Sequence, residues 1–142
     1  MLKIGLVGYS DKKFDRELAE KLTHIGLLDA VNRNQNGYDS DGICLVSGLT
    51  NIGIPAIGYS FAEKMGWKTV GIACKKASDY ECFDVDEKII VGDEWGDESK
   101  KFIDYIDVLV RIGGGKQSLA EENQAKEKGC EVYSYELPLL KD

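Results

Sequence analysis

The stretch DVLVRIGGGKQSLAE, residues 107–121, decides the fold class. Its first six residues form a mostly apolar run of strand length, and three consecutive glycines follow. A helix is predicted over 118–128, ending at Gly129. Consecutive glycines let the backbone adopt positive φ and approach a ligand closely. The free N–H groups of the following helix point into the same space. A strand, a glycine turn and a helix in this order are typical of a parallel α/β sheet.

The same alternation extends outward over the rest of the chain. Strands are predicted at 3–8, 43–47, 68–74, 88–91, 107–112 and 130–135, with helices between most of them. Phe14, Leu18, Leu22 and Ile25 are spaced 4, 4 and 3 apart and share one face of the first helix. Right-handed crossovers place such helices on both faces of the sheet. The sequence therefore predicts a three-layer Rossmann-like α/β fold with a mostly parallel sheet of about six strands, as a single domain over 1–142.

The composition argues against nucleic-acid and membrane partners. The formal net charge of −7 argues against nucleic acid, which is bound through Lys and Arg. No apolar run approaches the roughly 20 residues of a membrane span, and the first residues lack the zones of a signal peptide. We therefore predict a cytoplasmic protein with no nucleic-acid and no membrane partner. The polar stretch 29–42 is predicted to be a loop, either a cover for a site or a plain surface insertion.

Metal and cofactor chemistry has little support in the sequence. The four cysteines form no CxxC pair, and His24 has no second histidine to share a metal. We expect no metal site and no cofactor. The glycine spacing also matches neither a P-loop nor the dinucleotide fingerprint GxGxxG.

Three loops with glycines or small polar residues follow the first, second and fifth predicted strands, at 8–11, 47–53 and 113–118. They converge if these strands are neighbours, because ligands of such sheets bind beyond the carboxyl ends of the strands. Backbone N–H groups there can hold a phosphate whatever the net charge. The predicted ligand-binding residues are Gly8, Tyr9, Ser10, Ser47, Gly48, Thr50, Asn51, Gly53, Arg111, Gly113, Gly114, Gly115, Lys116, Gln117, Ser118 and Glu121.

Glu121 has two interpretations. Its position three residues after Ser118 is that of a capping box, in which the glutamate returns to the N–H of the N-cap residue. A carboxylate one turn above a phosphate-binding loop can also bind ribose hydroxyls or act as an acid or base.

GGGKQSLAE at 113–121 resembles the GG-x-GT-x-x-E motif of the Lonely Guy family. That family belongs to the SLOG superfamily, with the DNA-processing protein A domain and the molybdenum-cofactor carrier proteins. SGLTNIGIPAIG at 47–58 is similar to the superfamily's other glycine loop, and KIGLVGYS at 3–10 fits its first strand and turn. The resemblance implies a Rossmann-like fold, a nucleotide or related phosphorylated ligand, and a homodimer or higher homo-oligomer.

Lonely Guy enzymes cleave the N-glycosidic bond of nucleoside 5′-monophosphates, and the resemblance gives Glu121 the place of their motif glutamate. Their catalytic arginine precedes the fifth strand. The corresponding segment of this chain, GDESKKF at 96–102, contains no arginine. We therefore expect a protein that binds a phosphorylated nucleotide or a nucleotide-derived signalling ligand as a sensor, carrier or sequestering protein. The alternative is a phosphoribohydrolase with Glu121 as catalytic residue and Arg111, Lys100 or Lys116 as the cation. A third interpretation is a structural or protein-binding role without a ligand.

Overall fold

The computed structural model describes residues 1–34 and 42–141, which form one sheet and its flanking helices. The strands are β1 (Leu2–Gly8), β2 (Ile43–Ser47), β3 (Lys68–Ala73), β4 (Glu87–Ile90), β5 (Val108–Ile112) and β6 (Glu131–Tyr135). The α-helices are α1 (Arg16–Asn34), α2 (Gly53–Met65), α3 (Ser99–Tyr105) and α4 (Lys116–Glu127), and a short 3₁₀ helix, η1, spans Lys75–Asp79.

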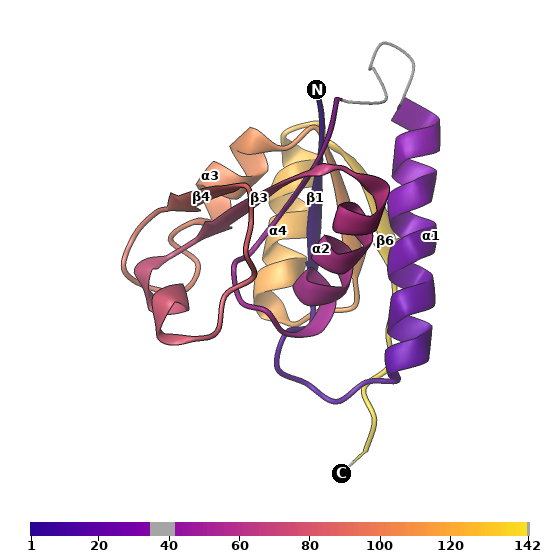
Figure 1. The fold of residues 1–142 in the computed structure, drawn as a ribbon, viewed down its shortest axis with the longest axis horizontal. Coiled ribbons are helices and arrows are strands. Elements are labelled where there is room, and N and C mark those ends of the chain that lie inside the picture. The colour runs from indigo at the N-terminus through magenta and orange to yellow at the C-terminus, as the bar shows by residue number, and fades with distance from the viewer. Residues whose placement is uncertain (35–41, 142) are drawn as a thin grey trace.

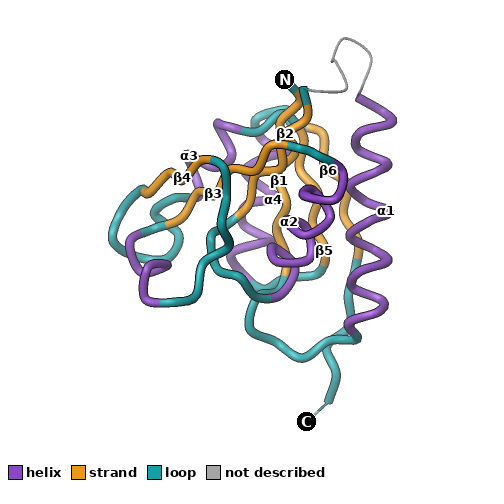
Figure 2. The backbone as a smooth tube through the Cα atoms, in the orientation of Figure 1, coloured by secondary structure: helices purple, strands orange, loops and turns teal. Residues whose placement is uncertain are grey.

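The sheet has the strand order β4-β3-β2-β1-β5-β6, and every pair of neighbours is parallel. The chain adds strands in one direction from β1 to β4, then returns through α3 and continues on the other side of β1. β1 and β5 therefore flank the point where the strand order reverses, and the loops after β1, β2 and β5 emerge at the same edge (Figure 2). The expected adjacency of these three strands is confirmed.

Helices cover both faces of the sheet, as predicted (Figure 1). Leu2, Ile4 and Leu6 of β1 belong to the core cluster under α1 and α2. Val7 belongs to the second cluster, which contains Phe102 of α3 and Ala125 of α4. This alternation of side chains along β1 is the geometry of a strand that is buried on both sides. The α/β three-layer class predicted from the sequence is confirmed.

Helix α1 differs from the expectation in extent and in its buried face. It starts at Arg16 and continues to Asn34, so the first part of the predicted 29–42 loop is helical, and 35–41 lie outside the described residues. Leu18 and Ile25, members of the apolar stripe found in the sequence, are 37% and 49% exposed. The side that packs on the sheet consists mostly of small residues: Ala19, Thr23, Gly26, Leu27, Ala30 and Val31. They permit a close approach, since a Cβ on Gly26 would lie 2.9 Å from Cγ1 of Val110.

Gly8, at the end of β1, has no room for a side chain. A Cβ there would lie 2.4 Å from the Ile112 carbonyl oxygen and 2.9 Å from Cβ of Ile54, whereas a Cβ on Gly48 after β2 would meet no atom within 4 Å. We expect Gly8→Ala to lower the free energy of unfolding by about 1–3 kcal/mol through overpacking against backbone. The matched control Gly48→Ala should change it by no more than about 0.5 kcal/mol. Urea unfolding of both variants checks this, and equal effects would contradict the packing at Gly8.

Candidate functional site

A cavity of about 510 Å³ opens at the carboxyl edge of the sheet, beside the point where the strand order reverses. Its volume lies within the range of small-ligand sites, and its place is the usual one for ligands of open α/β sheets. The lining comes from the loops after β1, β2 and β5, the end of β3, the starts of α2 and α4, and the segment around the start of α3. The lining residues are Leu6, Val7, Gly8, Tyr9, Ser10, Asp11, Lys12, Ser47, Gly48, Leu49, Thr50, Pro55, Ile72, Ala73, Trp95, Glu98, Phe102, Gly115, Lys116, Gln117, Ser118 and Glu121.

The glycine turn after β5 aims the N-terminus of α4 at this cavity. Gly113 and Gly114 have φ values of 60° and 115°, and a Cβ on Gly114 would lie 2.5 Å from Oγ of Ser118, so the turn requires glycine there. Gly115 is the N-cap residue, and a Cβ on it would meet no atom within 4 Å. The first N–H groups of a helix have no intrahelical acceptor and carry about half a positive charge. With Lys116 in the first turn, the arrangement suits an anion.

The start of α4 settles the capping-box interpretation. Because the helix begins at Lys116, Ser118 lies inside the first turn, and no side chain caps the helix. The capping box predicted from Ser118 and Glu121 is therefore wrong. Glu121 instead accepts a hydrogen bond of 3.0 Å from Oγ of Ser99, at the start of α3.

Two glutamates lie side by side on the cavity wall. Glu98 and Glu121 are only 5% and 6% exposed, and Nε2 of Gln117 donates a hydrogen bond of 2.9 Å to Oε1 of Glu98. Burial raises the pKa of Glu121 from an ordinary 4.5 to about 7, and the charge of Glu98 adds to the rise. Hydrogen bonds from Ser99 and Gln117 act in the opposite direction on this pKa. Near neutral pH this carboxyl group is therefore able to give or accept a proton.

The loop after β2 is held by buried hydrogen bonds. Oγ of Ser47 donates to the Leu6 carbonyl at 2.6 Å, and the Ser47 N–H donates to the Tyr59 hydroxyl at 3.1 Å. Gly48 and Thr50 line the cavity beside Ser47. The structure places the predicted site residues Asn51 and Gly53 outside the lining. Gly53 instead lets α2 start against the loop after β1, since a Cβ there would lie 2.2 Å from the Tyr9 carbonyl oxygen.

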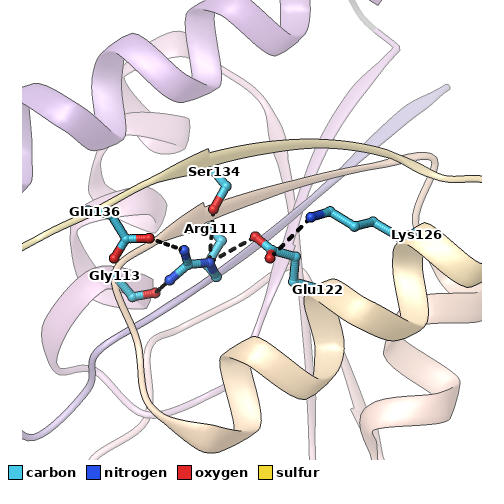
Figure 3. A network of polar contacts seen from close by, with 6 residues as sticks. All are labelled: Arg111, Gly113, Glu122, Lys126, Ser134 and Glu136. Carbon is cyan, nitrogen blue, oxygen red and sulfur yellow. Dashed lines mark hydrogen bonds and ion pairs between the residues drawn. The ribbon is translucent and has the colours of Figure 1, made fainter.

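Arg111 also lies outside the lining, in a polar network between β5, β6 and α4 (Figure 3). Its Nη1 donates to the Gly113 carbonyl at 2.8 Å, and its Nε donates to Glu122 at 2.9 Å and to Ser134 at 3.0 Å. Nη2 forms an ion pair with Glu136. Only 4% of the residue is exposed. The guanidinium group thus holds the carbonyl of the first turn glycine, while Gly113 and Gly114 shape the turn without lining the cavity.

The sequence did not single out five polar or aromatic residues of the wall: Asp11, Lys12, Trp95, Glu98 and Phe102. Trp95 is 46% exposed, its ring centroid lies 6.0 Å from that of Tyr80, and its flat face suits stacking on a ligand ring. Lys100, predicted as a possible cation, lies outside the lining and pairs with Asp104 at 2.9 Å. Glu98 lies in the segment where the Lonely Guy resemblance predicts an arginine. It follows Asp97 in an acidic stretch, and nothing in that stretch indicates a ligand-binding residue.

Neither a protein-family model nor a curated protein matches the sequence. Solved structures do match the fold. A molybdenum cofactor binding protein from the phototrophic bacterium Rippkaea orientalis superimposes with a TM-score of 0.73 at 22% identity, over 95% of this chain and 76% of that one. The chain has the fold of molybdenum cofactor carrier proteins. The carrier protein from Chlamydomonas reinhardtii gives a TM-score of 0.70 at 20% identity, over 96% and 78% of the two chains. The Rossmann-like fold expected from the sequence is thus confirmed.

Two features of the described residues bear on membrane and metal partners. Within residues 1–34 and 42–141, no helix has the length and apolar character needed to cross a membrane. Within the same residues, no group of three or more His, Cys, Asp or Glu side chains is arranged to hold a metal ion. Cys44 and Cys74 are buried, and all four cysteines are free thiols.

The raised pKa of Glu121 predicts a pH dependence of stability. The folded state holds this proton up to about pH 7, whereas an unfolded glutamate releases it near 4.5. The folded state therefore binds more protons between these values, and stability falls as the pH rises from 4.5 to 7. The loss is on the order of 3 kcal/mol.

Glu121→Gln removes this titration, so the stability of the variant should not fall in this way. The free energy of unfolding of the variant should therefore rise relative to that of the wild type as the pH increases from 4.5 to about 8. Urea unfolding across this range measures it. The control Glu127→Gln, at an exposed position of the same helix, should follow the wild type. Parallel curves for Glu121→Gln and the wild type would contradict the buried, protonated state.

Proposed function

We propose that the protein binds a small phosphorylated ligand with a heterocyclic ring, of the nucleotide or pterin-cofactor kind, as a carrier, sensor or sequestering protein. The observation that carries this proposal is the N-terminus of α4, which opens through Gly115 and Lys116 into the 510 Å³ cavity. Helix N-termini of this kind, at the carboxyl edge of a parallel sheet, bind phosphate groups.

The charges on the wall favour one phosphate group over a polyphosphate. Lys12 and Lys116 are the cations among the lining residues, and Asp11, Glu98 and Glu121 are acids. The charge of a monophosphate at Lys116 is largely offset by the lysine and the helix N-terminus together, whereas further phosphates would approach the carboxylates.

Aromatic and hydroxyl groups supply the rest of the site. Trp95 and Phe102 offer apolar surface to a ring, and Ser10 and Thr50 offer hydroxyl groups to a sugar or a ring edge. The buried carboxylates of Glu98 and Glu121 suit N–H donors of a base or pterin. The similar structures are proteins of the molybdenum cofactor, which supports a carrier role for this chain.

Phosphoribohydrolysis is the second candidate function. Glu121 favours it, because a buried carboxyl group with a pKa of about 7 is suited to acid or base catalysis. Glu98 weighs against it, since a carboxylate adjoins Glu121 and no arginine lines the described cavity. Glycosidic cleavage with a phosphate ligand needs positive charge near the reacting groups. We therefore rank ligand binding above phosphoribohydrolysis. We also propose that the protein is a cytoplasmic homodimer.

The binding proposal is tested by incubating the protein with nucleoside monophosphates, NAD-derived cyclic nucleotides, cyclic oligonucleotides and molybdenum cofactor. Free ligand is removed, the protein is heated, and mass spectrometry identifies what is released. A compound that returns intact supports a binding protein. Free base accumulating in the incubation solution together with ribose 5-phosphate would establish the hydrolase instead. Neither a retained compound nor these products across the panel would contradict both.

Gly115→Asp tests the phosphate site without disturbing the fold. Aspartate is a favourable N-cap residue and its Cβ meets open space, yet its carboxylate occupies the anion position. We expect Gly115→Asp and Lys116→Ala to weaken binding of the retained ligand at least about tenfold, the effect of one lost charge-assisted contact. Lys88→Ala, the same change at an exposed position of β4, is the matched control. Unchanged affinity in the first two variants, measured by calorimetry, would contradict the site.

A further inference from the structure

Two buried carboxyl groups lie beside the anion site proposed at the start of α4. Nε2 of Gln117, in the first turn of the helix, donates a hydrogen bond of 2.9 Å to Oε1 of Glu98, and Glu121 follows one turn further along. Glu98 and Glu121 both line the cavity, and they are only 5% and 6% exposed. An anion held by the free amides at the start of α4 therefore lies close to both carboxyl groups.

The hydrogen bonds of this pair come from neutral groups. Oγ of Ser99 donates to Glu121 at 3.0 Å, and the Gly96 N–H approaches Oε2 of Glu98 at 3.3 Å. Among the residues that the structure describes, no lysine, arginine or histidine forms an ion pair with either carboxylate. Two buried negative charges without a positive partner repel each other and repel an incoming anion, because water screens them poorly. A proton on one of the two carboxylates reduces this repulsion.

We infer that the protein binds its anionic ligand together with a proton, which the Glu98–Glu121 pair takes up from solvent as the anion enters the cavity. The proton bonds to a carboxylate oxygen, and no other covalent bond changes. It belongs to the pair, because two carboxyl groups that interact this closely titrate together. This proton uptake depends on the proposed phosphate site of α4, and it makes the affinity of that site depend on pH.

The free protein holds such a proton only in part of its molecules at neutral pH. Burial, with the charge of Glu98, raises the pKa of Glu121 from 4.5 to about 7. The negative charge of a bound ligand favours the protonated form and raises this pKa further. Between the pKa of the free protein and that of the complex, the complex binds more protons, so the affinity falls as the pH rises through this range.

The other titratable side chains of the cavity wall come from two elements. The loop after β1 contributes Tyr9, Asp11 and Lys12, and α4 contributes Lys116. The lining residues from β2, β3, α2 and the body of α3 carry no charge. All four titratable residues are unchanged in a Glu121→Gln variant, so a comparison of this variant with the wild type isolates the titration of the pair.

Sulfate is the probe for this inference, because it remains a dianion near neutral pH, whereas a phosphate monoester titrates near pH 6. The protein is titrated with sulfate in EDTA and at constant ionic strength, so that no divalent cation supplies the positive charge. The amide resonances of Lys116, Gln117 and Ser118 report binding. We expect the dissociation constant of the wild type to be about five to twenty times larger at about pH 8.5 than at about pH 6.5, as uptake of up to one proton requires.

Glu121→Gln should show less than about a twofold change over the same range and should bind sulfate more tightly than the wild type at the highest pH. The matched control Glu127→Gln, at an exposed position of α4, should follow the wild type. Glu98→Gln is a second variant of the pair. It should move the pH dependence to lower pH, because it removes the charge next to Glu121.

A pH-stat measurement detects the proton directly. At about pH 7.5, addition of sulfate to the wild type should consume about half a proton per chain, and none in Glu121→Gln. Saturable amide shifts with an affinity that does not change with pH, and without proton uptake, would overturn the inference and leave the phosphate site standing. The absence of saturable shifts at these amides at every pH would overturn both.

Discussion

Five register pairs join β5 to β1, from Ile4–Val108 to Gly8–Ile112, and the site depends on this contact. The pairing brings the loop after β1 against the glycine turn after β5, at the point where the strand order reverses. Gly8 has no room for a side chain there, and Arg111 fixes the Gly113 carbonyl from the side of β6. Without this contact, the N-terminus of α4 would have no cavity to face.

Much of the fold is predictable from the sequence because buried parallel strands are continuous apolar runs bounded by glycines and polar residues. The strand order is not predictable in this way, since no local pattern says that residues 107–112 return to pair with β1. The outward face of α1 shows a second limit. Helical spacing finds an apolar stripe, but the buried stripe is the one whose small residues, such as Ala19 and Gly26, allow close packing.

The site, too, is only partly predictable from the sequence. Sixteen ligand-binding residues are predicted from the sequence, most of them in loops that follow strands. Eleven of these sixteen line the cavity, including Gly8, Ser47 and Lys116. Arg111 is a cation close to the glycine turn, as a phosphate-binding residue would be. Its side chain is instead bound to Glu122, Ser134 and Glu136. Glu98 and Trp95 come from an acidic segment without periodicity, and only the tertiary fold brings them beside Glu121. Their contribution follows from α3 packing on β1, which no short motif encodes.

The proposed function depends above all on the N-terminus of α4 holding the phosphate group of the ligand. The most direct measurement is a titration of ¹⁵N-labelled protein with the ligand identified by mass spectrometry, followed through the backbone amide resonances. We expect saturable shifts at Lys116, Gln117 and Ser118, the amides at the start of α4, and no such shifts in Gly115→Asp. Saturable binding that leaves these three amides unmoved and shifts residues outside the cavity would contradict it.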